Sequence, residues 1–114
     1  MRRSTNETKT IGASAALSDV MDFRAWAGGI ILMPGTWTAA SIGFQVAATS
    51  GGTYYPLYDE DGSLVQIASP TASKAYAIPA EVFGASFVKI WSQNGSGTGT
   101  NQAAARALVI TLKG

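Results

Sequence analysis

The clearest hydrophobic pattern in the chain is an alternation over residues 41–49, in which Ile42, Phe44 and Val46 share one face. A period of two is typical of a half-buried β-strand and not of a helix. The serine and glycines that follow predict a turn, and residues 53–58 predict the returning strand. This part of the chain therefore indicates the middle of an antiparallel β-sheet.

Similar patterns predict strands along most of the chain, with the alternations at 87–92 and 107–112 the strongest after 41–49. Pro79 favours one helical turn over 79–83, which Gly84 would end. The remaining expected strands are residues 9–17, 19–26, 30–33, 63–68 and 75–78. Of these, we expect residues 30–33 to be fully buried. Short strands with closely spaced turns predict an all-β fold: a single antiparallel β-sandwich, jelly-roll-like, of about eight strands.

The length of 114 residues suits one domain. Residues 1–8 are polar and include Arg2 and Arg3, so we expect a flexible N-terminal arm there and a β-sandwich domain over residues 9–114. The arm is either a frayed terminus or a tether that reaches a neighbouring subunit.

Composition narrows the function classes. Only 13% of residues are charged, where about 25% is typical, and such surfaces are common in assemblies because few charges must be desolvated. The net charge of +1 provides no basic field for nucleic acid. No cysteine or histidine is present, which removes disulfides and the commonest zinc ligand and general base.

Targeting signals are weak. The first three residues resemble the start of a signal peptide, but a polar segment follows them. The longest apolar stretch, residues 28–33, is far too short to cross a bilayer. We expect a protein made in the cytoplasm, without membrane contact.

The carboxylates have ordinary explanations. Residues 59–62, Asp-Glu-Asp-Gly, offer oxygen ligands, but the position at which an EF-hand loop needs glutamate is Pro70, so a hairpin turn is the better interpretation. Asp19, Asp22 and Glu81 have no spacing that suggests acid–base catalysis. We therefore expect no enzyme activity, no metal site and no cofactor.

Aromatic side chains are the main candidates for a sugar-binding platform, although core and subunit-interface roles are the favoured interpretation. They are Trp37, Tyr54, Tyr55, Tyr58 and Trp91. Tyr54 and Tyr55 are adjacent, so in a strand we expect one in the core and the other exposed. Trp91 shares a face with Lys89, which favours exposure. Arg106 is expected to pair with Asp59 or Asp22 or to cover apolar surface with its stem. The Gly/Ser/Thr-rich residues 93–101 lack a phosphate-loop signature and are either a flexible connection or a segment that orders on contact.

The order of motifs resembles a known family. The matching segments are residues 33–34, 37–40, 44–47, 50–55, 57–62, 79–92 and 101–110. Together they are similar to small β-sandwich proteins encoded among the structural genes of tailed bacteriophages and phage-like prophages. The resemblance covers residues 19–112 and consists of packing and turn motifs, which are specific for fold and weak for role.

The resemblance implies a virion component, with capsid decoration (cement) as the favoured role: the protein would bind the major capsid protein on the capsid exterior as a homo-oligomer, expected to be a trimer. A carbohydrate-binding module on a phage tail or head fibre is the alternative. Small polar loops and the arm would supply the contacts. The candidate interface residues are Arg2, Arg3, Tyr55, Trp91, Asn94, Ser96, Thr98 and Thr100.

Overall fold

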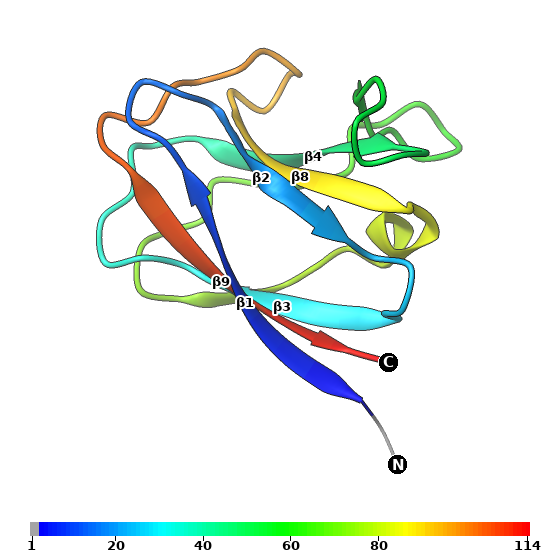
Figure 1. Cartoon of the computed structure of the whole chain (residues 1–114). Helices are drawn as coiled ribbons and strands as arrows, with labels where there is room; N and C mark the ends of the chain where they lie inside the picture. Colours follow the sequence, from blue (N-terminus) through cyan, green and yellow to red (C-terminus); the bar gives the residue numbers. More distant parts are fainter. Residues whose placement is uncertain (1–2) are drawn as a thin grey trace.

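The computed structural model describes residues 3–114, and its regular secondary structure is almost entirely β-strand (Figure 1). The strands are β1 (Ser4–Ile11), β2 (Leu17–Asp22), β3 (Gly28–Leu32), β4 (Ser41–Ala47), β5 (Tyr55–Pro56), β6 (Gln66–Ile67), β7 (Ala75–Ala77), β8 (Phe87–Gln93) and β9 (Arg106–Lys113). One 3₁₀ helix, η1 (Ala80–Gly84), precedes β8 and confirms the helical turn predicted after Pro79. No helix in the described part of the chain is long and apolar enough to cross a membrane.

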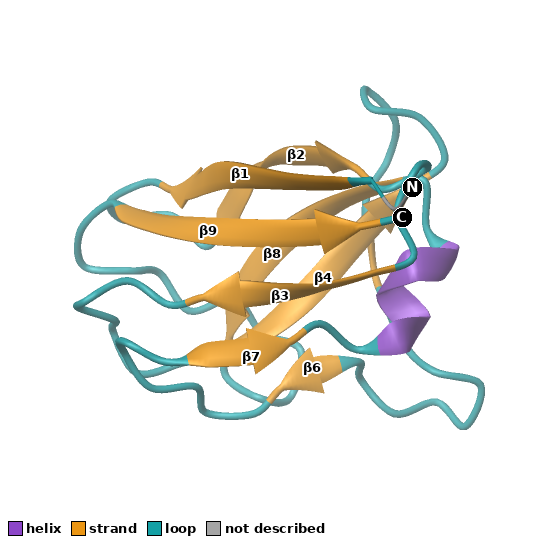
Figure 2. Cartoon of the chain, turned by 90° about the horizontal axis from the view of Figure 1, so that it is seen from below, coloured by secondary structure: helices purple, strands orange, loops and turns teal. Residues whose placement is uncertain are grey.

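The strands form one antiparallel sheet in the order β5-β4-β8-β2-β1-β9-β3-β7, with β6 also on β4. The sheet curls strongly into a half-barrel (Figure 2). Its two halves are joined where β1 meets β2 at Ile11 and Ser18. The all-β, antiparallel prediction is confirmed. The strands are not clearly divided into the two sheets of a jelly-roll sandwich, because this β1–β2 pairing makes the hydrogen-bonded sheet continuous.

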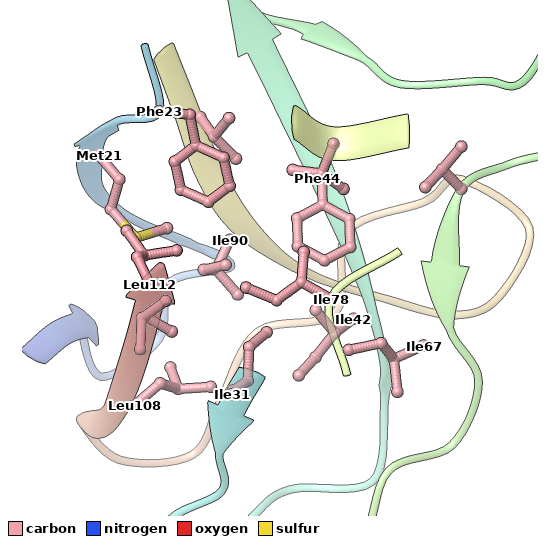
Figure 3. Packing of buried hydrophobic residues seen from close by; sticks show 14 of the residues in the cluster. Met21, Phe23, Ile31, Ile42, Phe44, Ile67, Ile78, Ile90, Leu108 and Leu112 are labelled. Carbon is pink, nitrogen blue, oxygen red and sulfur yellow. The ribbon is translucent and has the colours of Figure 1, made fainter. Parts of the chain in front are cut away.

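The core fills the inside of the curl (Figure 3). Leu108, Ile110 and Leu112 of β9 are fully buried, as their alternation predicted, and they lie across from Ile42, Phe44 and Ile90 on the other half of the sheet. These side chains are aliphatic or aromatic, so burial of apolar surface stabilises the curl. The core is therefore a single cluster that both halves of the sheet share.

The predicted arm is wrong for residues 4–8. They belong to β1, which pairs with β9 from Ser4 opposite Lys113 to Ile11 opposite Arg106. The threonines of this segment suit a strand, and β9 satisfies its backbone groups along one side. Met1 and Arg2, the rest of the predicted arm, lie outside the described residues.

Four other strand predictions need correction. The expected strand over residues 9–17 ends at Ile11, and the chain turns before β2 begins. Residues 30–33 were expected to be fully buried, but Ile30 and Leu32 are 38% and 39% exposed because only Ile31 and Met33 point into the core. β5 and β6 are also shorter than the sequence indicated.

Candidate interaction surface

The glycine-rich loop, residues 93–101, has a defined conformation. The Oε1 atom of Gln93 accepts hydrogen bonds from the backbone N–H of Gly95 (2.6 Å) and of Gly97 (3.2 Å). Both glycines have positive φ angles, 93° and 91°, which other residues rarely adopt. Gln93 is fully buried and donates from Nε2 to Gln66 Oε1 at 2.7 Å. A flexible connection is therefore the wrong description of the loop.

Asn94 organises the tip of the same loop. Its Oδ1 atom accepts hydrogen bonds from the backbone N–H of Ser96 (2.8 Å) and of Thr98 (3.3 Å). Its own N–H donates to the Thr98 carbonyl at 2.9 Å. The side chains of Ser96 and Thr98 are left exposed. The loop presents small polar groups on a backbone that its own side chains hold, which lowers the entropic cost of a contact.

Trp91 lies beneath this loop. It shares a face with Lys89, as predicted, yet only 5% of its surface is exposed. A Cβ on Gly43 would lie 2.9 Å from Trp91 Cε3, and one on Gly99 would lie 3.5 Å from Nε1. The ring is thus enclosed between β4 and the loop. The prediction that Trp91 is an exposed interface residue is wrong.

A second buried amide supports the loop from the other side. Gln102 Nε2 donates to the Thr38 carbonyl (3.0 Å) and to Ser92 Oγ (2.9 Å). Its Oε1 atom accepts from Thr38 N–H (2.9 Å) and from Arg106 Nε (3.2 Å). The guanidinium of Arg106 also donates to Thr38 Oγ1 at 3.1 Å. Arg106 pairs with these neutral oxygens and not with either carboxylate that the sequence suggested.

Those two carboxylates have other partners. Asp22 forms an exposed ion pair with Arg24 at 2.8 Å, and the side-chain hydrogen bond from Arg24 lowers the pKa of Asp22 to about 2. Asp59 Oδ1 accepts from the N–H groups of Asp61 and Ser63, both at 2.9 Å. Gly62 has a φ of 83°, so the hairpin-turn interpretation of residues 59–62 is confirmed. Among residues 3–114, no three acidic, histidine or cysteine side chains are grouped to hold a metal ion.

The five candidate aromatics do not form one platform. Tyr55 and Tyr58 are 65% and 48% exposed, but Trp37 packs against the core and Trp91 is enclosed. The Tyr54 ring lies 4.5 Å from Lys89 Nζ in a cation–π contact. Of the adjacent pair, Tyr55 is exposed as expected, but the expectation that the other tyrosine lies in the core is wrong: Tyr54 lies on the sheet surface beside Lys89 and not in the core cluster. Sugar stacking would therefore depend on the two exposed tyrosines.

The remaining interface candidates fall into separate places. Asn94, Ser96, Thr98 and Thr100 share the glycine-rich loop, beside Ser41 at the start of β4. Tyr55 pairs with Val46 at the other end of that strand. Other candidates, Arg3 and Arg2, belong to the N-terminus. Arg3 lies over the ring of Trp26 at 5.1 Å, and Arg2 is outside the described residues.

A hollow of about 430 Å³ beside the loop was not predicted from the sequence. Its lining combines three segments that are distant in sequence: residues 39–41, residues 69–71, and Asn94 with Thr100. No local sequence pattern predicts that these three distant segments lie together. The signal that sequence does contain is the Gln-Asn-Gly run, because amide side chains before glycines commonly hydrogen-bond to their own turn.

Comparison with known proteins identifies the fold. No family model matches the chain, and no curated protein sequence matches it. Among solved structures, the chain is similar to the crystal structure of the SPBc2 prophage-derived protein YomS, with a TM-score of 0.63 and 11% sequence identity. The alignment covers 100% of this chain and 96% of that one. The chain therefore shares, over its whole length, the fold of a prophage-derived protein.

Proposed function

We propose that the chain is a structural protein of a tailed-bacteriophage particle, and that it binds the outside of the capsid lattice as a decoration (cement) protein. The observation that carries the proposal is the end-to-end similarity of fold to a prophage-derived protein of nearly the same length. The motif order over residues 19–112, which resembles phage structural proteins, supports it independently.

The surface chemistry also supports a role in an assembly. With 13% charged residues, the exterior consists largely of small polar and apolar side chains. Charged side chains are depleted in the cores of protein interfaces, because their burial removes water from them. An exterior of this composition therefore has few charged groups that would lose their water on contact with many neighbours.

The mechanism would be mechanical bridging. A continuous, curled sheet with one shared core provides a rigid body between adjacent capsid subunits. The glycine-rich loop would contribute contacts through Asn94, Ser96 and Thr98, whose backbone is already ordered. Many copies on one lattice make weak single contacts sufficient for retention.

The test is the copy number per purified particle, measured by quantitative mass spectrometry against the major capsid protein. A simple fraction of the capsid copy number supports decoration. A few copies per particle would favour the carbohydrate-binding alternative on a tail or head fibre, with Tyr55 and Tyr58 as the stacking residues. Absence from the particle would overturn both.

A second measurement addresses the loop. Replacing Ser96 and Thr98 together by arginine leaves the backbone hydrogen bonds of Asn94 in place but adds bulk and charge at the tip. Particle binding should fall while the melting temperature stays unchanged. A matched Thr53→Arg variant, also at an exposed loop position, is the control. Undiminished binding of the double variant would remove the loop from the mechanism.

A further inference from the structure

β1 has the longest unpaired edge among residues 3–114. It pairs with β9 along its whole length on one side, but on the other side it meets β2 only at Ile11. The two strands diverge from the turn that joins them (Figure 1), so residues 4–10 form the margin of their half of the sheet. The strands at the far edges are short: β5 and β6 have two residues each, with Pro56 in β5, and β7 has three. The edge of β2 that faces β1 is also unpaired except at Ser18, but β2 has six residues against eight in β1. Short strands and proline discourage strand addition, whereas a long free edge favours it.

The inner face of this edge carries one positive and one negative charge. Glu7 lies opposite Ile110 and Lys9 opposite Leu108, and both of those β9 residues point into the core. The two charged side chains are therefore on the core side of the sheet, where they form an ion pair with each other at 3.5 Å and remain partly accessible. Inward charges on an edge strand exclude a partner that cannot neutralise them.

We propose that the occupant of this edge is a second copy of the chain, and that two β1 strands pair antiparallel about a two-fold axis at Thr8. In that register Glu7 faces the partner's Lys9, and Lys9 faces the partner's Glu7. Thr8 faces its own counterpart on the outer side. Opposite charges and threonine pairs across antiparallel strands are stabilising. The result is a continuous sheet across two molecules, with the same patch contributed by each, as an isologous dimer requires.

The charge pattern selects this register. Two copies related by such an axis must keep their inner faces on the same side, so the register can change only in whole pleats. The next register in one direction places Glu7 opposite its own counterpart, and the next in the other direction does the same for Lys9. Both juxtapose like charges, which is unfavourable. The ion pair therefore serves as a specificity element that accepts the chain's own β1 and rejects unmatched strands.

The proposal goes beyond the decoration role, because it concerns the free protein and needs no particle. The experiment measures the mass of the purified full chain by sedimentation equilibrium. A species of twice 11.8 kDa is expected for the natural sequence. Lys9→Glu and Glu7→Lys should each raise the dimer dissociation constant about tenfold or more, because both cross-strand pairs become repulsive. Lys74→Glu, the same charge change at an exposed loop residue, is the matched control.

The decisive step mixes the two single variants. Lys9→Glu carries two negative charges at these positions and Glu7→Lys carries two positive ones, so their mixture should form a heterodimer while neither associates alone. Far-UV circular dichroism of each variant checks that the fold is retained. A monomeric natural chain, a trimer such as the family resemblance leads one to expect, a dimer unaffected by Lys9→Glu, or a mixture that stays monomeric would each overturn the pairing.

Discussion

Two regions of this molecule are buried in different ways. Inside the curl, the core cluster consists of aliphatic, methionine and phenylalanine side chains from both halves of the sheet. On the outer side of β4 and β8, the region beneath the glycine-rich loop contains Trp91 and the fully buried Gln93, and a second fully buried glutamine, Gln102, supports the loop from the other side. The first region is stabilised mainly by removing apolar surface from water. The second depends on hydrogen bonds, since a buried amide without partners is costly.

The two regions differ in which amino-acid substitutions they tolerate. An apolar core accepts substitutions that keep volume and shape, because its contacts have no required direction. The amide network requires particular donors and acceptors: Gln93 alone holds two N–H groups of the loop and one amide of Gln66. The first three predictions below separate the two regions and the fourth concerns an exposed ion pair; they are given in order of decreasing effect.

The largest loss is expected in the core. Ile110→Ala should lower the free energy of unfolding by about 3 kcal/mol, because a fully buried aliphatic side chain leaves a cavity. Val109→Ala, the adjacent residue on the outer face of β9, is the control and should cost about 1 kcal/mol or less. Urea unfolding measures both. Equal losses of unfolding free energy in the two variants would contradict the assignment of Ile110 to the core face and Val109 to the outer face of β9.

The loop network comes next. Gln93→Ala should cost about 2 kcal/mol, since it leaves the N–H groups of Gly95 and Gly97 and the Gln66 amide without this partner. Hydrogen exchange at those two glycines should accelerate, while exchange in β9 changes only with global stability. Ser96→Ala, at the exposed tip, is the control. Unchanged exchange at Gly95 would contradict the role assigned to Gln93.

A smaller loss is expected from crowding at the boundary between β4 and Trp91. Gly43→Ala should cost about 1 to 2 kcal/mol, because the new methyl group would lie 2.9 Å from the ring and 3.3 Å from Gln93 Cγ. Gly28→Ala is the matched control, because nothing lies within 4 Å of its Cβ position. Thermal unfolding compares the two variants. The idea fails if Gly43→Ala melts at the temperature of the unsubstituted protein.

The smallest effect belongs to neither buried region. The pKa of Asp22 is lowered to about 2 by Arg24, so its ion pair stabilises the folded state at pH above the ordinary value of 3.8. That contribution is lost as the pH falls from about 4 through 2. Both side chains are exposed, so solvent screening keeps the effect small. Comparing melting temperatures with Asp22→Asn should show a slight difference at pH 7 that shrinks as the pH falls from about 4 through 2; a constant difference would contradict the pairing.

Sequence reasoning succeeded where a local period determines the outcome. The inward positions of β9, the alternation of β4 and the helical turn after Pro79 follow from neighbours along the chain. The Asp-Gly turn at residues 61–62 follows from the conformational freedom of glycine. These features could be predicted because no distant residue decides them.

It failed where a distant segment provides the partner. Residues 4–8 appeared to be an arm because they lack an apolar face, yet β9 supplies backbone hydrogen bonds that need no apolar side chains. Trp91 appeared exposed because it alternates with core residues, yet the loop after β8 folds back over it. The hollow beside the loop likewise depends on three separated segments.

The pairing of β1 with β9 also has a consequence for how the protein is made. Ser4 and Lys113 are neighbours in the sheet although they lie at opposite ends of the sequence. Such long-range contacts slow folding, because the chain must close a large loop before the contact contributes. During synthesis, β1 leaves the ribosome before β9 and has no β9 to pair with until residues 106–113 have been translated. We expect the nascent chain to stay incompletely folded on the ribosome, with native structure appearing only after residues 106–113 have emerged.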